Sequence, residues 1–314
     1  AGITTAYSPD LGLWVCGLDF STSFSELIQI SSDGGVTWTR VSTPANGGQV
    51  FRVRWGGGKF VCAYKVGSTR RIMTSVNGTT WTTQTTPITS IDWADLAYSE
   101  TLNLWVVVGR VNSSTNIITS DDGGVTWTQR THPGSLQLNC VAWSPVAGLF
   151  VALGGVSGSG PHLITSVDGT NWLAQSDPGG STSSWLGVWW ANRQYVAVTA
   201  TGANVRAMTS TDGVAWTVQA TSSPDKTWQM VARGAGLWVA CANSGASTQA
   251  TMYGASAASW TAGTTPSIRF CEDIMWGALP GCEATVGCSI TIGGGGVIGN
   301  VWDGMTQTPG NCFA

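Results

Sequence analysis

One segment of this sequence recurs at a nearly fixed interval. Its clearest copy is Ser120-x-Asp122-Gly123-Gly124-x-Thr126-Trp127. Residues 31–38 repeat it, shorter forms span 75–81, 166–172 and 210–216, and looser copies end at Trp260 and Trp302. The seven tryptophans that end these copies lie 42–46 residues apart. A period of this length indicates a protein built from repeated structural units.

The chemistry of the segment is that of a tight turn between two strands. Glycine adopts positive φ without steric cost, and the side chain of Asp or Asn can accept hydrogen bonds from nearby backbone amides. The Thr-Trp-Thr that follows suits the start of an outer strand, and the indole can cover the turn. We assign to this acidic turn the residues Asp33, Trp38, Asn77, Trp81, Asp122, Trp127, Asp168, Trp172, Asp212, Trp216 and Trp260.

So many acidic turns have two interpretations. They form either a ring of metal-binding or catalytic carboxylates, or a folding device in which each Asp fastens its own hairpin. We favour the folding device, because a catalytic residue need not be copied once per repeat, whereas a folding device must be.

Each repeat shows the pattern of four short strands. The first strand ends in an aromatic residue followed by a small one, and the second is apolar, as in Leu104-Trp-Val-Val107. The sixth repeat departs from this pattern with Ala232-Arg233-Gly234. Four strands per unit, repeated radially, predict an all-β fold, a β-propeller of four-stranded antiparallel blades. The seven repeats predict a single domain with blades at about 1–43, 44–86, 87–132, 133–177, 178–221, 222–265 and 266–314.

Composition excludes some classes of function. The formal net charge is −3 and only 10% of the residues are charged, which argues against a basic nucleic-acid-binding face. No run of about 18 apolar residues is present, so we expect no membrane insertion. The first residues, Ala1-Gly-Ile-Thr-Thr, show no signal-peptide pattern.

The eight cysteines do not have the spacing of a metal site. No Cys-x-x-Cys pair occurs, and His132 and His162 stand apart from every cysteine, so we expect neither a metal nor a cofactor. The cysteines are either free thiols in the core or partly oxidised. Four cysteines cluster in the last repeat, and we expect at least one disulfide that ties this repeat together or to the first repeat, and therefore an extracellular or virion-surface location. These four are Cys271, Cys282, Cys288 and Cys312.

The kernel Ser-x-Asp-Gly-Gly-x-Thr-Trp resembles the Asp-box, or BNR repeat, which occurs in sialidases, in other propellers of the sialidase superfamily, in photosystem II assembly factors and in many phage virion proteins. The resemblance covers the whole chain as a repeat and implies a propeller with Asp-box turns. It implies little about function, because the box serves structure in enzymes and non-enzymes alike.

A sialidase-like site would imply three arginines that clamp a carboxylate, a Tyr-Glu nucleophile pair and an Asp acid/base. The pair Arg52 and Arg54 faintly resembles the arginine motif of sialidases, but it lacks the proline and follows the first acidic turn. Asp95 and Asp273 lie three residues before a strand-ending aromatic, Arg52 occupies the same level, and Glu272 adjoins Asp273. These four are the only catalytic candidates. We favour the alternative that they are channel charges that neutralise one another.

A binding function has its own candidates. Trp93, Trp185 and Trp228 stand five residues before the strand-ending position of their repeats. At the rim of a propeller face, their rings would stack on sugar rings; between blades, they would be core residues. The loops between the second and third strands are rich in Ser, Gly, Thr and Asn, as in adaptable recognition surfaces.

We therefore predict a non-enzymatic propeller used for binding or as a structural component. The resemblance favours a phage or virus-particle protein, such as a capsid decoration, a tail protein or a receptor-binding module. Its partners would be other protein subunits of a large assembly or a surface glycan. The alternative is a sialidase-like glycoside hydrolase. An assembly factor of the photosystem type is a third possibility, but the basic patch expected of it is missing.

The repeat itself predicts a stability effect. Replacing Trp127 with Ala should lower the free energy of unfolding by about 3–5 kcal/mol, because it empties a buried aromatic site. Asp122→Ala should lower the melting temperature without changing the affinity for any ligand. Chemical and thermal denaturation measure both effects, and an unchanged melting temperature in Asp122→Ala would contradict the assigned role of the turn.

Overall fold

The computed structural model describes residues 2–18, 25–45, 47–155, 162–179, 183–200, 206–221, 226–234, 236–242, 251–263, 271–278, 286–292 and 296–299. Asp273 and Ile274 are the only residues after 263 whose side chains are described. No helix in these ranges is long and apolar enough to cross a membrane.

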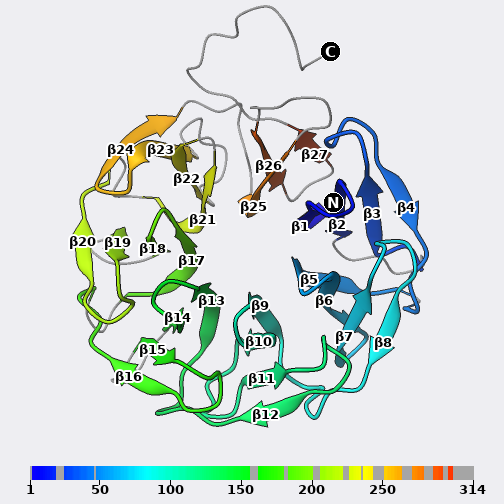
Figure 1. Cartoon of the computed structure of the whole chain (residues 1–314), viewed down its shortest axis with the longest axis horizontal. Coiled ribbons are helices and arrows are strands. Elements are labelled where there is room, and N and C mark those ends of the chain that lie inside the picture. The colour runs from blue at the N-terminus through cyan, green and yellow to red at the C-terminus, as the bar shows by residue number, and fades with distance from the viewer. Residues whose placement is uncertain are drawn as a thin grey trace, which may run out of the picture.

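The described chain forms seven antiparallel sheets arranged in a ring (Figure 1). Six sheets have four strands in chain order, and the seventh has three described strands. The strands are β1 (Gly2–Ser8), β2 (Leu13–Leu18), β3 (Ile28–Ser31) and β4 (Thr39–Val41); β5 (Gln49–Gly56), β6 (Lys59–Val66), β7 (Thr69–Ser75) and β8 (Thr82–Gln84); β9 (Trp93–Ser99), β10 (Leu104–Gly109), β11 (Ile117–Ser120) and β12 (Thr128–Arg130); β13 (Leu138–Ser144), β14 (Leu149–Gly154), β15 (Leu163–Ser166) and β16 (Leu173–Gln175); β17 (Trp185–Ala191), β18 (Gln194–Thr199), β19 (Ala207–Ser210) and β20 (Thr217–Gln219); β21 (Trp228–Gly234), β22 (Leu237–Ala242), β23 (Thr251–Ser256) and β24 (Ser259–Gly263); and β25 (Cys271–Ala278), β26 (Val286–Ile292) and β27 (Gly296–Gly299).

The order of strands gives the disc two different faces. In each blade the first strand lies nearest the centre of the ring (Figure 1). Because successive strands are antiparallel, the turn after the first strand and the acidic turn after the third strand lie on the same face, which we call the turn face. The connections between the second and third strands, and those between blades, lie on the opposite face, which we call the loop face.

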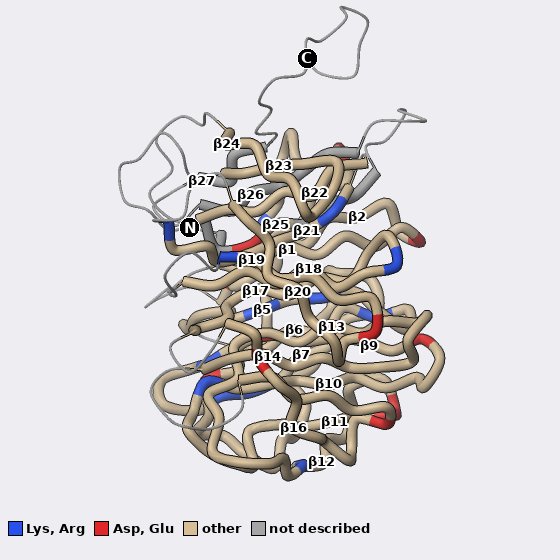
Figure 2. The backbone as a smooth tube through the Cα atoms, turned by 90° about the vertical axis from the view of Figure 1, so that its left-hand side faces the viewer, with Lys and Arg blue, Asp and Glu red and all other residues tan. Residues whose placement is uncertain are grey.

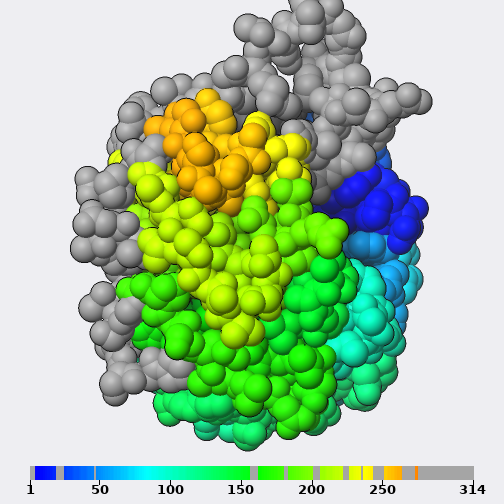
Figure 3. All heavy atoms as spheres, turned by 60° about the vertical axis from the view of Figure 1, so that its left-hand side comes forward, coloured from blue at the N-terminus to red at the C-terminus, as the bar shows by residue number. Residues whose placement is uncertain are grey.

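The hydrophobic core lies between blades rather than within one of them. One cluster joins Val15 of the first blade to Phe60 and Trp81 of the second, and further clusters join each later pair of blades up to the contact of Met230 with Ile274. Successive blades accordingly form one continuous packed surface in the space-filling view (Figure 3). The ring is closed by packing of the first strand, β1, against β25 of the last sheet.

In the first five blades, side-chain hydrogen bonds hold the acidic turn together, whereas in the sixth blade Trp260 Nε1 has no hydrogen-bond partner among the described residues. In the third blade, Ser120 Oγ donates to Asp122 Oδ1 at 2.8 Å, and the backbone amides of Val125 and Thr126 donate to the same carboxylate at 2.9 Å. Trp127 Nε1 donates to the Gly124 carbonyl at 2.9 Å, which places the indole over the turn. The turns of the first, second, fourth and fifth blades repeat the carboxylate or amide bonds and the indole bond.

The turns of the second to fifth blades also dock on the preceding blade, which the repeat pattern alone did not show. A Cβ built on Gly78 would lie 2.5 Å from Leu13 Cδ2, and one on Gly169 would lie 2.6 Å from Leu104 Cδ2. These leucines begin the second strand of the blade before. The turn glycine has positive φ and also leaves room for that neighbouring side chain, so the same residue serves the turn and the blade interface.

Most of the predicted architecture is confirmed: an all-β ring of four-stranded antiparallel sheets. The fourth strand of the last repeat and its Trp302 lie outside the described residues, so the seventh blade is described only in part. The blade boundaries stay predictions. So does the disulfide of the last repeat, because its four cysteines lie outside the described side chains, while Cys16, Cys62 and Cys140 are buried free thiols.

The turn carboxylates predict a specific dependence of stability on pH. Partial desolvation raises the pKa of Asp122, but hydrogen bonds from Thr126, Ser120 and Val125 outweigh it and lower the pKa from 3.8 to about 2. The ionised side chain therefore stabilises the fold fully above about pH 4, and this stability is lost as the pH falls towards 2.

The variant Asp122→Asn isolates this effect, because Asn77 already accepts the same backbone bonds in the second blade at 2.8 and 3.0 Å. We expect the melting temperature of wild type to exceed that of Asp122→Asn at pH 5, and the difference to shrink at pH 2. Thermal unfolding followed by circular dichroism measures it. An equal difference at both pH values would show that the ionised carboxylate is not what stabilises the turn.

Candidate functional site

The centre of the ring holds one layer of buried residues, one from each inner strand. The layer lies three residues before the strand-ending position of each blade, where the sequence placed Arg52, Asp95 and Asp273. Every described member is buried. The members are Thr4, Arg52, Asp95, Cys140, Gly187, Met230 and Asp273. Arg54 joins the layer from β5, where it lies two residues after Arg52 and so on the same side of the strand.

Two arginines and two aspartates form a closed set of ion pairs in this layer. Arg52 Nε lies 3.3 Å from Asp95 Oδ1, and Arg52 Nη1 lies 3.3 Å from Asp273 Oδ1. Arg54 Nη2 lies 3.2 Å from Asp95 Oδ1, and Arg54 Nη1 lies 2.9 Å from Asp273 Oδ2. Each carboxylate thus contacts both guanidinium groups, and the four formal charges cancel.

Further hydrogen bonds hold both carboxylates in place. Thr4 Oγ1 and the Thr5 amide donate to Asp273 Oδ2 at 2.9 and 3.1 Å, and the Val141 amide donates to Asp95 Oδ2 at 3.2 Å. Arg52 Nη2 also reaches Met230 Sδ at 3.9 Å, on the far side of the ring. Side chains of the first, second, third, sixth and seventh blades therefore meet in one layer.

The pKa of Asp273 reflects this arrangement. Complete burial raises it, but the positive charges of Arg54 and Arg52 and the bonds from Arg54 and Thr5 outweigh burial and lower it. Burial lowers the pKa of Arg54, and Asp273 and Asp95 more than compensate and raise it. Asp273 therefore stays ionised and tied to arginine, whereas a general acid needs a raised pKa.

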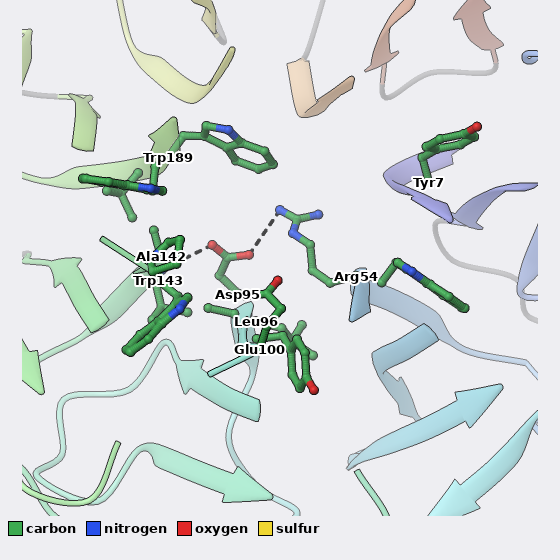
Figure 4. A pocket seen from close by; sticks show the side chains of 15 residues that line it. Tyr7, Arg54, Asp95, Leu96, Glu100, Ala142, Trp143 and Trp189 are labelled. Carbon is green, nitrogen blue, oxygen red and sulfur yellow. Dashed lines mark hydrogen bonds and ion pairs between the residues drawn. The ribbon is translucent and has the colours of Figure 1, made fainter. Parts of the chain in front are cut away.

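A cavity of about 370 Å³ opens beside this layer, towards the turn face. Arg54 and Asp95 line its inner end, and in Figure 4 their side chains point towards each other across it, joined by a dashed line. The aromatic side chains in the wall come from five successive blades: Tyr7, Trp55, Tyr98, Trp143, Trp189 and Trp190. Glu100, in the turn after β9, adds a carboxylate near the mouth.

The wall aromatics are held in place by a second ring in their own blade. Tyr98 packs on Trp105 in a tilted arrangement with a centroid distance of 5.0 Å, and Trp55 packs on Phe60 at 4.5 Å. Equivalent pairs occur in the first, fourth and fifth blades. Most of the wall aromatics stay partly exposed, as a contact surface for a ligand requires. In the sixth blade the equivalent residue is Arg233, which lies over Trp238 at 5.9 Å.

The structure brings together three of the four catalytic candidates, Arg52, Asp95 and Asp273, and binds them to one another. The side chain of the fourth, Glu272, lies outside the described residues. The ligand-binding candidates Trp93, Trp185 and Trp228 are at most 1% exposed, and each belongs to a core cluster. Their burial favours the second interpretation, in which they are core residues between blades.

The cavity itself was missed by sequence reasoning. Its wall consists largely of the strand-ending aromatics, whose spacing in the sequence indicates only the period of the repeat. The signal was present: an aromatic recurs at the end of each inner strand, and inner strands meet around a common axis. Among the described residues, no group of His, Cys, Asp and Glu has the arrangement of a metal site.

No family model matches this chain, and no curated protein matches it. Solved structures do, at low sequence identity. A streptogramin B lyase structure aligns over 92% of this chain and 90% of its own, with TM-score 0.72 and 9% identity. A catalytically inactive virginiamycin B lyase from Staphylococcus aureus, with quinupristin, gives TM-score 0.70, 12% identity and coverage of 92% and 91%. YCF48 bound to D1 peptide gives TM-score 0.53, 14% identity and coverage of 76% and 74%. At these identities the similarity shows the propeller fold alone.

The central ion pairs predict a large stability effect. Asp273→Asn should lower the free energy of unfolding by about 3–5 kcal/mol, because it leaves two buried guanidinium groups short of a counter-charge. The matched control is Asp92→Asn, which removes the partly exposed pair of Asp92 with Arg70 at 2.6 Å and should cost less than about 1 kcal/mol. Guanidinium chloride denaturation measures both variants. Equal costs would contradict a structural role for the buried set.

Proposed function

We propose that this chain is a non-enzymatic binding propeller whose ligand occupies the aromatic-lined cavity on the turn face. One observation carries the proposal. Aromatic rings from five blades converge on a partly exposed cavity, while the carboxylates of Asp95 and Asp273 beside it form ion pairs with arginines. Concave sites with aromatic walls and a few polar groups are the usual form of a ligand site.

The chemistry of the cavity supports binding rather than hydrolysis. A glycosidase needs two carboxyl groups that face the scissile bond, one of them protonated. Asp273 is fully buried behind Arg54 and has a lowered pKa, so it is neither protonated nor in reach of a ligand. Asp95 is held by both arginines and by the Val141 amide. Glu100 is the remaining carboxylate in the cavity wall. Among the described residues, no second free carboxyl group lines the cavity with it, as acid and base chemistry would require.

The biological setting belongs to the proposal as well. We propose that the chain acts as a component of a larger assembly, such as a virus particle, and meets protein or glycan there. The propeller of YCF48, with its bound D1 peptide, supports protein partners in general. The Asp-box-like repeat supports the virion setting, since the resemblance extends to many phage virion proteins.

The cavity can be tested with one wall residue. Screening a glycan array and a random-peptide library should yield a ligand, and Trp55→Ala should weaken its binding about tenfold, because stacking on an aromatic face is lost. Tyr253→Ala, a partly exposed aromatic of β23 outside the cavity wall, is the matched control and should leave the affinity unchanged. Isothermal calorimetry gives the affinities.

Two outcomes would contradict the proposal. A ligand whose affinity is the same for wild type and for Trp55→Ala would place the binding site elsewhere. Turnover of a fluorogenic glycoside that is abolished by Asp95→Asn would show that the chain is an enzyme.

A further inference from the structure

Exposed aliphatic side chains are concentrated on the turn face. Ten large hydrophobic residues of the described chain are exposed, and eight of them lie in turns of this face. Five of the eight are valines, one in each acidic turn of the first five blades, with 43–68% of their surface exposed. These are Val36, Val76, Val125, Val167 and Val214. Three more lie in the turns that follow the inner strands: Leu11, Leu102 and Val146.

The fold does not require these valines. In the first, third and fifth turns the valine follows the last turn glycine, as in Gly124-Val125. In the second and fourth it stands between Ser and Asn or Asp, as in Ser166-Val167-Asp168. A residue needed for folding recurs at a fixed position, as Ser, Gly and Trp do here. Each turn has one exposed valine, but its position in the turn changes. This indicates that the valine serves the surface of the protein rather than the folding of the turn. Exposed apolar groups gathered on one face mark interaction sites.

The charge of the same face is acidic. The described turns of this face and the strand ends beside them carry seven carboxylates and three cationic side chains. The carboxylates are Asp10, Asp33, Glu100, Asp121, Asp122, Asp168 and Asp212, and the cations are Lys59, Arg193 and Arg233. Acidic segments accordingly recur along the right-hand edge of the molecule in Figure 2. A surface with this excess of carboxylates over cationic side chains is complementary to a basic partner.

The cavity lies at the centre of this face and has matching chemistry. The ion-paired arginines and aspartates at its inner end are neutral as a set. Glu100 therefore gives the cavity an excess negative charge, beside the partly exposed rings of Tyr98 and Trp55. Aromatic faces attract a Lys or Arg side chain through the ring quadrupole, and a nearby carboxylate adds to the attraction.

From these observations we infer that the turn face is a docking surface for a basic protein partner, which lays apolar side chains on the ring of valines and inserts a Lys or Arg side chain into the cavity. The inference rests on the proposed function in one respect, since it assigns an occupant to the same cavity. The ring of valines is an independent part of it, because a sugar that fills the cavity would make no use of aliphatic groups in the surrounding turns.

The test uses a phage-displayed library of random 20-residue peptides, selected against the whole chain. The selected peptides should be enriched in Lys and Arg together with apolar residues. The most enriched peptide, made synthetically, should bind about tenfold more weakly to the variant in which the five turn valines are replaced by Ser, and about three- to tenfold more weakly to Glu100→Gln. All six replaced side chains are exposed, so circular dichroism should show an unchanged fold.

The loop face supplies the controls. Val111→Ser removes an exposed valine, 36% exposed, from the connection between β10 and β11. Glu26→Gln removes a partly exposed carboxylate, paired with Arg40, from the connection between β2 and β3. Both should bind the peptide as wild type does.

The outcomes separate the two proposals. If the peptide depends on Trp55 but not on the valines, or if only glycans bind and they depend on Trp55, the docking surface is overturned and the cavity site stands. Selection of acidic peptides, or of no peptide at all, also overturns the docking surface. If peptide binding depends on the valines but not on Trp55 or Glu100, the cavity assignment fails.

Discussion

The interaction on which the structure depends is the hydrogen bonding of one carboxylate or amide side chain inside the acidic turn of each of the first five blades. In the third blade, Asp122 binds the amides that follow it, the following strand begins at Thr128, and the indole of Trp127 closes over the turn. The turn then docks on the blade before it through its glycine. A local hydrogen bond therefore fixes both the hairpin and the interface between blades. Because the turn recurs once per blade, it produces the 42–46-residue period of the sequence.

The centre of the ring meets a different constraint. Inner strands from all blades converge there, and their side chains must fill the channel or line it. Here Arg52 and Arg54 bridge Asp95 of the third blade and Asp273 of the seventh, while Thr4 of the first blade binds Asp273. These contacts join the first described blade to the last one, where no shared strand does so among the described residues. The charges that would suggest catalysis serve to close the ring.

Much of the fold could be predicted from the sequence, because it depends on short-range rules repeated many times. The turn, the strand order and the common level of Arg52, Asp95 and Asp273 all follow from period and register. The cavity could not be predicted, because Tyr98 and Trp55 pack on a ring of their own blade in the same way whether or not their other face is exposed. Trp93, conversely, has the pattern of a rim residue but is buried between blades. Exposure of an aromatic ring depends on how the blades meet, and spacing within one repeat does not contain that information.

The most direct test of this account is the location of the bound ligand. Hydrogen–deuterium exchange of the whole chain, with and without a saturating ligand from the screens, reports which backbone segments become protected. We expect protection of the turns that surround the cavity, at residues 57–58, 100–103, 145–148 and 192–193. Protection confined to the connections of the loop face, such as residues 110–116, would contradict it.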